Sequence, residues 1–229
     1  MAVIVVTGMA RGGTTFAAKV IGEATDRPTH PEILNPSDRR VPKGVLPYQA
    51  DPPMPYLERR FKKAIELNSI LKDPFLAPYV TTIRAHWTNQ VIAMVRHPAA
   101  VANSFVRVGW WPRTDHLPIP QHEERHLRLA ALYQYIYSGL VADKVPIFRA
   151  EDLANKPITT MMKMLMALGE EGDITVASKY LDPSFGTDLG RGQHKFRRSP
   201  AAMDNWKRTP MLIHLKAILR EAPIAQTWY

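Results

Sequence analysis

The amino-acid sequence predicts an α/β fold of three layers, in which a central parallel β-sheet is flanked by helices on both faces. Residues 2–6 and 91–95 are short, β-branched apolar runs, which are typical of strands buried on both sides. Segments with helical patterning alternate with these runs and with a further strand candidate at 145–148. We expect residues 1–229 to form a single domain, because the length suits one α/β unit and no repeat or linker divides the chain.

The predicted elements follow one another in a regular order. The first strand leads into a glycine-rich loop at residues 7–15 and then into a helix at 16–23, an order that opens many nucleotide-binding α/β folds. Pro98 follows the strand at 91–95 and occupies a first helical position, where the missing N–H of proline is harmless. Apolar residues at helical spacing predict helices at residues 56–71, 98–108, 122–141, 157–168 and 211–220.

Composition narrows the classes of protein to which the chain can belong. Hydrophobic residues make up 45% of the chain, enough to bury a core, and the absence of cysteine excludes disulfides, thiolate catalysis and cysteine-based zinc sites. Thirty lysines and arginines stand against 21 aspartates and glutamates, an excess that favours a polyanionic ligand. The apolar run at 2–6 is too short for a signal peptide or a membrane span, so we expect a soluble, cytoplasmic protein.

Residues 8–15, Gly-Met-Ala-Arg-Gly-Gly-Thr-Thr, follow the first strand directly. Gly8, Gly13 and Thr15 have the spacing of a phosphate-binding loop, but Thr14 stands where ATPases and kinases have a lysine. That lysine neutralises the β- and γ-phosphates, so its replacement weakens the alternative of a P-loop kinase. Backbone amides and the N-terminus of the following helix would still bind an anion. The expected fold is therefore P-loop-like.

The same stretch resembles the 5′-phosphosulfate loop of sulfotransferases that use 3′-phosphoadenosine-5′-phosphosulfate (PAPS), usually written Pro-Lys/Arg-Ser-Gly-Thr-Thr-aromatic. The resemblance implies that Arg11 contacts the bridging oxygen or the 5′-phosphate and stabilises charge on the leaving group. It also implies that Phe16, in the aromatic position of the pattern, stacks on adenine. The remaining residues to which it assigns cofactor binding are Gly12, Gly13, Thr14 and Thr15.

A second motif resembles the 3′-phosphate site of the same family, in which a strand runs into Arg-Asp/Asn-Pro and a serine follows in the helix. Here Arg96 leaves the strand at 91–95 and Ser104 lies two turns into the helix, with His97 in place of the usual Asp or Asn. The fork of donors on Arg96 suits a phosphate dianion, and the Ser104 hydroxyl can reach the same phosphate. The two motifs together imply a sulfotransferase that moves a sulfuryl group from PAPS to a hydroxyl or amine acceptor.

The resemblance also implies candidate catalytic residues. Glu32 follows the first helix, where several sulfotransferases place a catalytic glutamate, and His30 is the alternative base because of its intrinsic pKa. Lys72 resembles the lysine of a Lys-x-Pro element in bacterial sulfotransferases and is expected to assist the sulfonate or the leaving oxygen. Arg197 and Arg198, in a basic loop, are expected to add to the 3′-phosphate site.

Other interpretations remain open at this point. His122 and His126 match the His-Glu-x-x-His pattern of zinc hydrolases, although charged residues stand between them and no third ligand is evident. A basic chain would also fit a nucleic-acid-binding protein, but we find no recognition motif and expect neither nucleic acid nor metal. The loop from Trp110 to His116 lies where the family often builds its acceptor pocket. We expect a small-molecule, glycan or lipid-linked acceptor.

Overall fold

The computed structural model describes residues 2–30, 32–35, 39, 41–179, 207 and 210–229. Within them a parallel sheet has the strand order β2-β3-β1-β4-β5, and Val6 of the central strand lies opposite Lys72 and Ile92 of its two neighbours. The carboxyl ends of the strands therefore lie along one edge of the sheet. The strands are β1 (Ile4–Gly8), β2 (Thr29–His30), β3 (Ile70–Lys72), β4 (Val91–Val95) and β5 (Ile147–Arg149).

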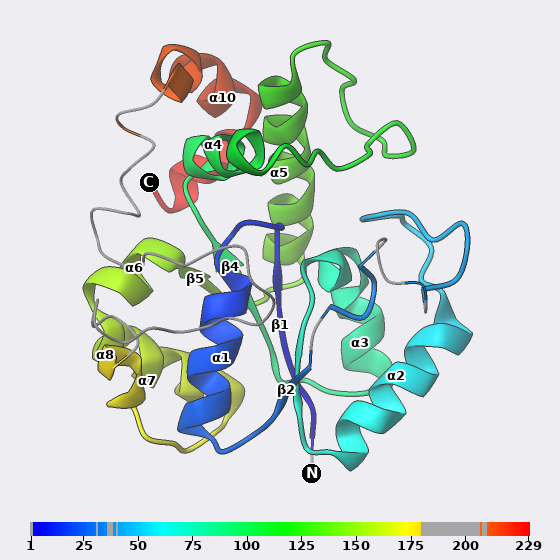
Figure 1. Cartoon of the computed structure of the whole chain (residues 1–229), viewed down its shortest axis with the longest axis vertical. Coiled ribbons are helices and arrows are strands. Elements are labelled where there is room, and N and C mark those ends of the chain that lie inside the picture. The colour runs from blue at the N-terminus through cyan, green and yellow to red at the C-terminus, as the bar shows by residue number, and fades with distance from the viewer. Residues whose placement is uncertain (1, 31, 36–38, 40, 180–206, 208–209) are drawn as a thin grey trace.

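Helices cover both faces of this sheet (Figure 1). One face carries α1 (Thr14–Ala24), α6 (Ala150–Asn155), α7 (Pro157–Leu168) and α8 (Val176–Lys179). The other carries α2 (Met54–Glu66), α3 (Val80–His86), α4 (Pro98–Val108), α5 (Arg125–Ala142) and α10 (Leu215–Glu221). Successive strand residues point to opposite faces, so Ile4 and Val6 pack with the first set of helices and Val3 and Val5 with the second. The predicted three-layer α/β fold is confirmed.

The elements next to the second motif have the predicted bounds, because β4 spans 91–95 and α4 spans 98–108. His97 is the N-cap of α4, and its Nδ1 accepts the backbone N–H of Ala99 at 3.2 Å. An aspartate or asparagine serves the same purpose at an N-cap. The replacement of the family's Asp or Asn by histidine therefore keeps the helix start intact.

The predicted helix at 56–71 is wrong at its end. α2 stops at Glu66, and Asn68, with φ of +47°, turns the chain into β3. Ser69 is buried in this turn, and both its backbone N–H and its hydroxyl donate to the carbonyl of Ala64. β3 is only three residues long, so its apolar residues could be read as a continuation of the apolar face of the helix.

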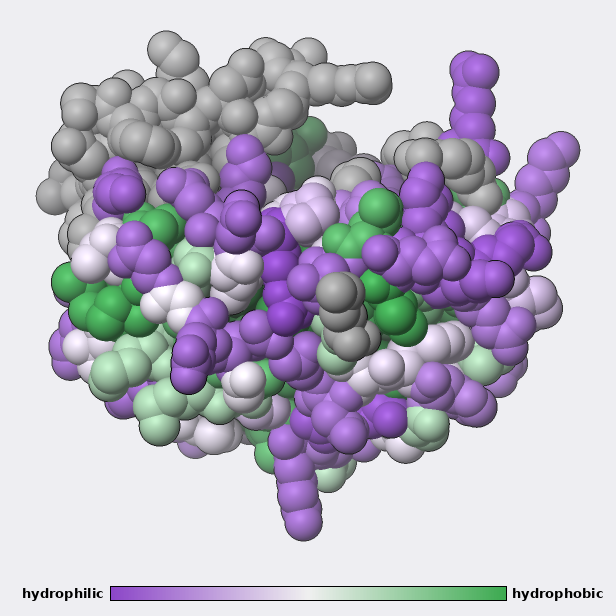
Figure 2. Space-filling view, turned by 90° about the horizontal axis from the view of Figure 1, so that it is seen from below, coloured by the Kyte–Doolittle hydropathy of each residue, from purple (hydrophilic) through white to green (hydrophobic). Residues whose placement is uncertain are grey.

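The surface at the amino-terminal edge of the strands is mostly hydrophilic with scattered apolar residues (Figure 2). It lies at the opposite end of the sheet from the loops that follow the strands (Figures 1 and 2). Among the described residues, no helix is both long and apolar enough to span a bilayer.

Candidate functional site

The carboxyl ends of the strands bring the predicted site residues to one edge of the sheet. The glycine-rich loop follows β1, Glu32 follows β2, Lys72 ends β3 and Arg96 follows β4. Ligands of open α/β sheets bind outside this edge, where helices on opposite faces diverge from neighbouring strands. Residues that are far apart in the sequence can therefore act on one ligand here.

The loop after β1 is shaped by its glycines. Gly13 has φ of +98° and is the N-cap of α1, a conformation that residues with a side chain rarely adopt. A Cβ on Gly12 would lie 2.7 Å from the carbonyl oxygen of Met9 and 3.3 Å from that of Met94. The family pattern has serine at the position of Gly12, and in this chain there is no space for it. The loop therefore offers backbone amides rather than a hydroxyl at that point.

Two buried tyrosines hold the loop in place. The hydroxyl of Tyr137 accepts the N–H of Met9 at 3.2 Å and donates to the carbonyl of Met94 at 2.7 Å, so it joins the loop to β4. The hydroxyl of Tyr48 accepts the N–H of Ala10 at 2.9 Å. Burial raises the pKa of both phenols well above the usual range, so both stay protonated. Neither residue was predicted from the sequence, because no local pattern links them to the loop.

Arg11 joins the two sequence motifs. Its Nε donates to Oγ of Ser104 at 2.8 Å, so the loop after β1 meets the second turn of α4. The pKa of Arg11 is lowered first by burial and then by the positive charges of Arg96 and Arg107, while the charge of Glu32 raises it. Arg11 and Arg96 therefore lie near each other on one edge of the sheet, which is the arrangement that a shared ligand requires.

Arg96 is poised for an anion. Its Nε is buried and has no hydrogen-bond partner among the residues that the structure describes. Burial lowers the pKa of Arg96, whereas nearby Glu151 and Tyr229 raise it. A buried guanidinium donor that is left unused is costly unless a ligand supplies the acceptor. This unused donor is suited to a phosphate.

Glu151 is the acidic residue next to Arg96, and its own hydrogen bonds are made elsewhere. One carboxylate oxygen accepts the backbone N–H of His97 at 3.1 Å, and the other accepts the hydroxyl of Tyr229 at 2.7 Å. The guanidinium carbon of Arg149 lies over the Tyr229 ring, 4.5 Å from the ring centroid. Glu151 thus ties the start of α6 to the turn after β4 and leaves the Arg96 Nε unpaired in the part of the chain that the structure describes.

Glu32 and Lys72 form an ion pair at the ends of β2 and β3. The second carboxylate oxygen of Glu32 accepts Nδ2 of Asn35 at 2.9 Å. Since Glu32 also acts electrostatically on Arg11, the predicted base and the predicted lysine lie beside the anion-binding loop. The structure brings these three residues into one cluster.

Asp73 fixes the segment that carries Glu32. Its carboxyl group is fully buried and accepts the N–H of Leu34 at 2.6 Å and that of Phe75 at 2.8 Å, while its carbonyl accepts the hydroxyl of Thr7 at 2.9 Å. Burial is the main cause that raises its pKa to about 7. Asp73 stands directly after Lys72 in the quoted Lys-x-Pro element, yet the sequence offered no sign of this bracing role.

His30, the alternative base, faces other charges. Burial lowers its pKa most, and Arg60 and Lys63 of α2 lower it further. Its Nε2 is buried without a hydrogen-bond partner in the described part of the chain. His30 ends β2 opposite Leu71 of β3, and its ring faces the basic residues of α2, whereas Glu32 is paired with Lys72.

The remaining predicted cofactor residues have different surroundings. Thr14 and Thr15 begin α1, with Thr14 buried and Thr15 half-buried. Phe16 is 1% exposed and belongs to the core between α1 and the sheet, so its stacking on a purine remains a prediction. Arg197 and Arg198 lie outside the described residues.

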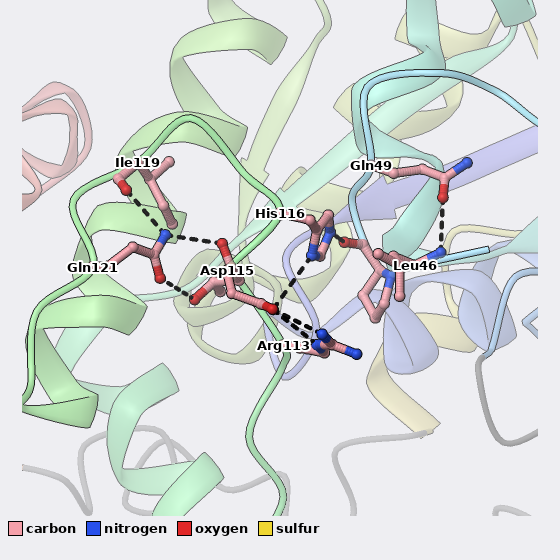
Figure 3. A network of polar contacts seen from close by, with 9 residues as sticks. Leu46, Gln49, Arg113, Asp115, His116, Ile119 and Gln121 are labelled. Atoms are coloured by element: carbon pink, nitrogen blue, oxygen red, sulfur yellow. Dashed lines mark hydrogen bonds and ion pairs between the residues drawn. The ribbon is translucent and has the colours of Figure 1, made fainter. Parts of the chain in front are cut away.

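The predicted acceptor loop rests on aromatic residues next to the site. Trp110 stacks on Phe105, which follows Ser104, at a centroid distance of 5.3 Å, and its edge meets Phe75 at 6.3 Å. Further along the loop, His116 bonds the carbonyl of Pro47 and exposed Arg113 pairs with Asp115 (Figure 3). The loop is thus tied to the proline-rich segment before α2.

The two histidines of the zinc-hydrolase alternative do not lie on one helix. α5 begins at Arg125, so His122 precedes the helix, and the predicted start of the helix at 122–141 is wrong. His122 lies 2.8 Å from Glu221, and the ring of His126 packs against that of His214 at a centroid distance of 4.0 Å. Among the described residues, no group of three or more His, Asp or Glu side chains is placed to hold a metal ion.

No family model matches the sequence, and no curated protein matches it at a significant level. Solved structures do resemble it. The sulfotransferase domain of the Synechococcus PCC 7002 olefin synthase has a TM-score of 0.60 and 16% identity, over 99% of this chain and 94% of that one. The sulfotransferase domain from the curacin biosynthetic pathway has a TM-score of 0.58 and 16% identity, over 96% of each chain.

A third similar structure is the mouse sulfotransferase SULT7A1 complexed with PAP. Its TM-score is 0.55 with 14% identity, over 99% of this chain and 87% of that one. These three structures are similar to the chain across nearly its whole length. The chain therefore has the fold of sulfotransferase domains.

Proposed function

We propose that the chain is a sulfotransferase that moves a sulfuryl group from PAPS to a hydroxyl or amine acceptor. The contact between Arg11 and Ser104 carries this proposal, because it joins the loop after β1 to the helix that Arg96 precedes. One nucleotide with phosphates at both its 5′ and 3′ positions suits two anion-binding elements that meet in this way. The similarity to sulfotransferase domains supports the same function.

The donor would bind through charge and backbone. The amides after β1 and the N-terminus of α1 suit the 5′-phosphosulfate, and the unused Nε of Arg96 with the Ser104 hydroxyl suits the 3′-phosphate. Arg11 belongs to the loop after β1 and bonds Ser104 of α4, so it joins these two elements. From there its guanidinium can stabilise negative charge that develops on the departing 5′-phosphate oxygen.

The acceptor would be activated by Glu32. In the transfer step, the acceptor oxygen or nitrogen forms a bond to sulfur, the bond from sulfur to the bridging oxygen breaks, and the acceptor proton passes to the Glu32 carboxylate. The ion pair with Lys72 would orient this carboxylate, and the Lys72 ammonium would also bond the sulfonate. We place Glu32 before His30 as the base because Glu32 belongs to the cluster around Arg11.

The acceptor and the location of the protein are further parts of the proposal. Trp110 stacks on Phe105, the neighbour of Ser104, and 37% of its surface is exposed. This exposed ring suits an acceptor with an apolar or sugar face. We propose a small-molecule, glycan or lipid-linked acceptor and a cytoplasmic location.

Isothermal titration calorimetry with 3′,5′-adenosine bisphosphate (PAP), AMP and ATP-magnesium tests the donor assignment. We expect PAP to bind at least tenfold more tightly than AMP, since the 3′-phosphate adds charge-assisted hydrogen bonds of about 1.5–3 kcal/mol. Arg96→Ala should abolish most of this preference. Preference for ATP-magnesium would favour the kinase, and equal affinity for all three would contradict the proposal.

A further inference from the structure

α4 carries a further arginine, Arg107, close to the site. Ser104 and Arg107 are three residues apart on this helix, so they lie on one face, one turn from each other. Ser104 is also the residue whose hydroxyl accepts Nε of Arg11. The side chain of Arg107 therefore starts one helical turn from the point where the two sequence motifs meet.

No acidic side chain neutralises Arg107 within the described residues. Arg107 is exposed and forms no ion pair there, while Glu32 is paired with Lys72 and Glu151 bonds Tyr229. The positive charge of Arg107 acts on both of the other arginines, because it lowers the pKa of Arg11 and that of Arg96. The charges of Arg96 and Arg107 thus act on Arg11, which bonds Ser104, and a bound anion would offset the mutual repulsion of the three guanidinium groups.

The charge of a 3′-phosphate calls for more than one guanidinium group. A terminal phosphate monoester carries close to two negative charges at neutral pH, more than one guanidinium offsets. Arg96 precedes α4 and has a buried Nε, whereas Arg107 stands near the exposed end of the helix with a long side chain that forms no ion pair in the described residues. A ligand phosphate bonded by the Ser104 hydroxyl would lie between Arg96 and Arg107.

We propose that Arg107 is a specificity-determining residue that contacts the 3′-phosphate of the donor together with Arg96 and Ser104. The inference rests on the proposed function and assigns to the donor site a residue that the sequence motifs do not include. Arg107 then contributes to discrimination between nucleotides with and without the 3′-phosphate, and it has little effect on the 5′-phosphate.

Calorimetric affinities for PAP and AMP, measured in wild type, Arg107→Ala and Arg107→Lys, test this inference. Arg107→Ala should fold normally, because alanine is a strong helix former at an exposed helical position. We expect it to weaken PAP binding about tenfold and AMP binding less than about twofold. Arg107→Lys should recover part of the loss. Lys163→Ala on α7 removes one exposed charge on the opposite face of the sheet and should change neither affinity.

The outcomes separate the two proposals. If wild type prefers PAP and Arg107→Ala binds both nucleotides as tightly as wild type does, the role of Arg107 is refuted and the donor assignment stands. Equal losses for PAP and AMP in Arg107→Ala would also refute it, since a general electrostatic effect would then explain the loss. If wild type binds PAP no better than AMP, the proposed function fails and the role of Arg107 fails with it.

Discussion

Replacing Asp73 by asparagine probes the support of the site through the pH dependence of stability. The buried carboxyl group accepts the N–H groups of Leu34 and Phe75, and burial raises its pKa from 3.8 to about 7. The folded protein therefore holds a proton on Asp73 more tightly than the unfolded chain does. Its contribution to the free energy of unfolding is complete below about pH 4 and is lost as the pH rises to about 7.

The magnitude follows from the size of the shift. A pKa raised from 3.8 to about 7 lowers the free energy of unfolding by about 3 kcal/mol between about pH 5 and pH 8. The amide in the Asp73→Asn variant cannot ionise, and it keeps only one of the two acceptor oxygens, so the substitution costs about 1–3 kcal/mol at every pH for the unpaired N–H. The stability of wild type relative to the variant should thus be about 3 kcal/mol lower at pH 8 than at pH 5.

Urea denaturation followed by tryptophan fluorescence at pH 5 and pH 8 measures this difference. Asp51→Asn, at an exposed aspartate, is the matched control and should show no such pH dependence. A difference between wild type and Asp73→Asn that stays constant from pH 5 to pH 8 would refute the reasoning, because Asp73 would then be ionised throughout.

Two further substitutions test the loop and the base. Gly12→Ala should lower the free energy of unfolding by about 1–3 kcal/mol and weaken PAP binding more than about tenfold, since a Cβ there meets backbone atoms; Gly139→Ala, in an open part of α5, should instead stabilise by about 0.5–1 kcal/mol in the same urea titration. Glu32→Gln should bind PAP like wild type and lose turnover of PAPS by roughly two orders of magnitude or more, as measured by PAP release, because the amide cannot accept the acceptor proton. An active Glu32→Gln enzyme would move the role of base to His30.

The sequence predicted the parts of the fold and site whose information is local. The apolar run of β4, the proline that starts α4 and the serine in its second turn are neighbours in sequence, so the second motif could be placed to the residue. The glycine-rich loop was likewise evident between β1 and α1. Lys72 and Glu32 were predicted one by one, and the structure pairs them.

The parts that sequence reasoning missed depend on contacts between distant residues. Tyr48 and Tyr137 brace the loop after β1 from 38 and 128 residues away, and a tyrosine in a proline-rich segment or a long helix has no feature that reveals this. Asp73 was passed over because the motif drew attention to the lysine before it. Arg107 has no motif of its own, and its place became evident only once Ser104 was seen to bond Arg11.

Solving a crystal structure of the chain with PAP would test the central claim most directly. The claim is that the loop after β1 binds the 5′-phosphate and the turn after β4 binds the 3′-phosphate of one nucleotide. We predict the 5′-phosphate against the backbone amides of Gly12 to Thr15 and the 3′-phosphate within hydrogen-bond distance of Arg96 and Ser104. A PAP molecule that contacts only one of the two elements would contradict the account, as would one bound elsewhere on the protein.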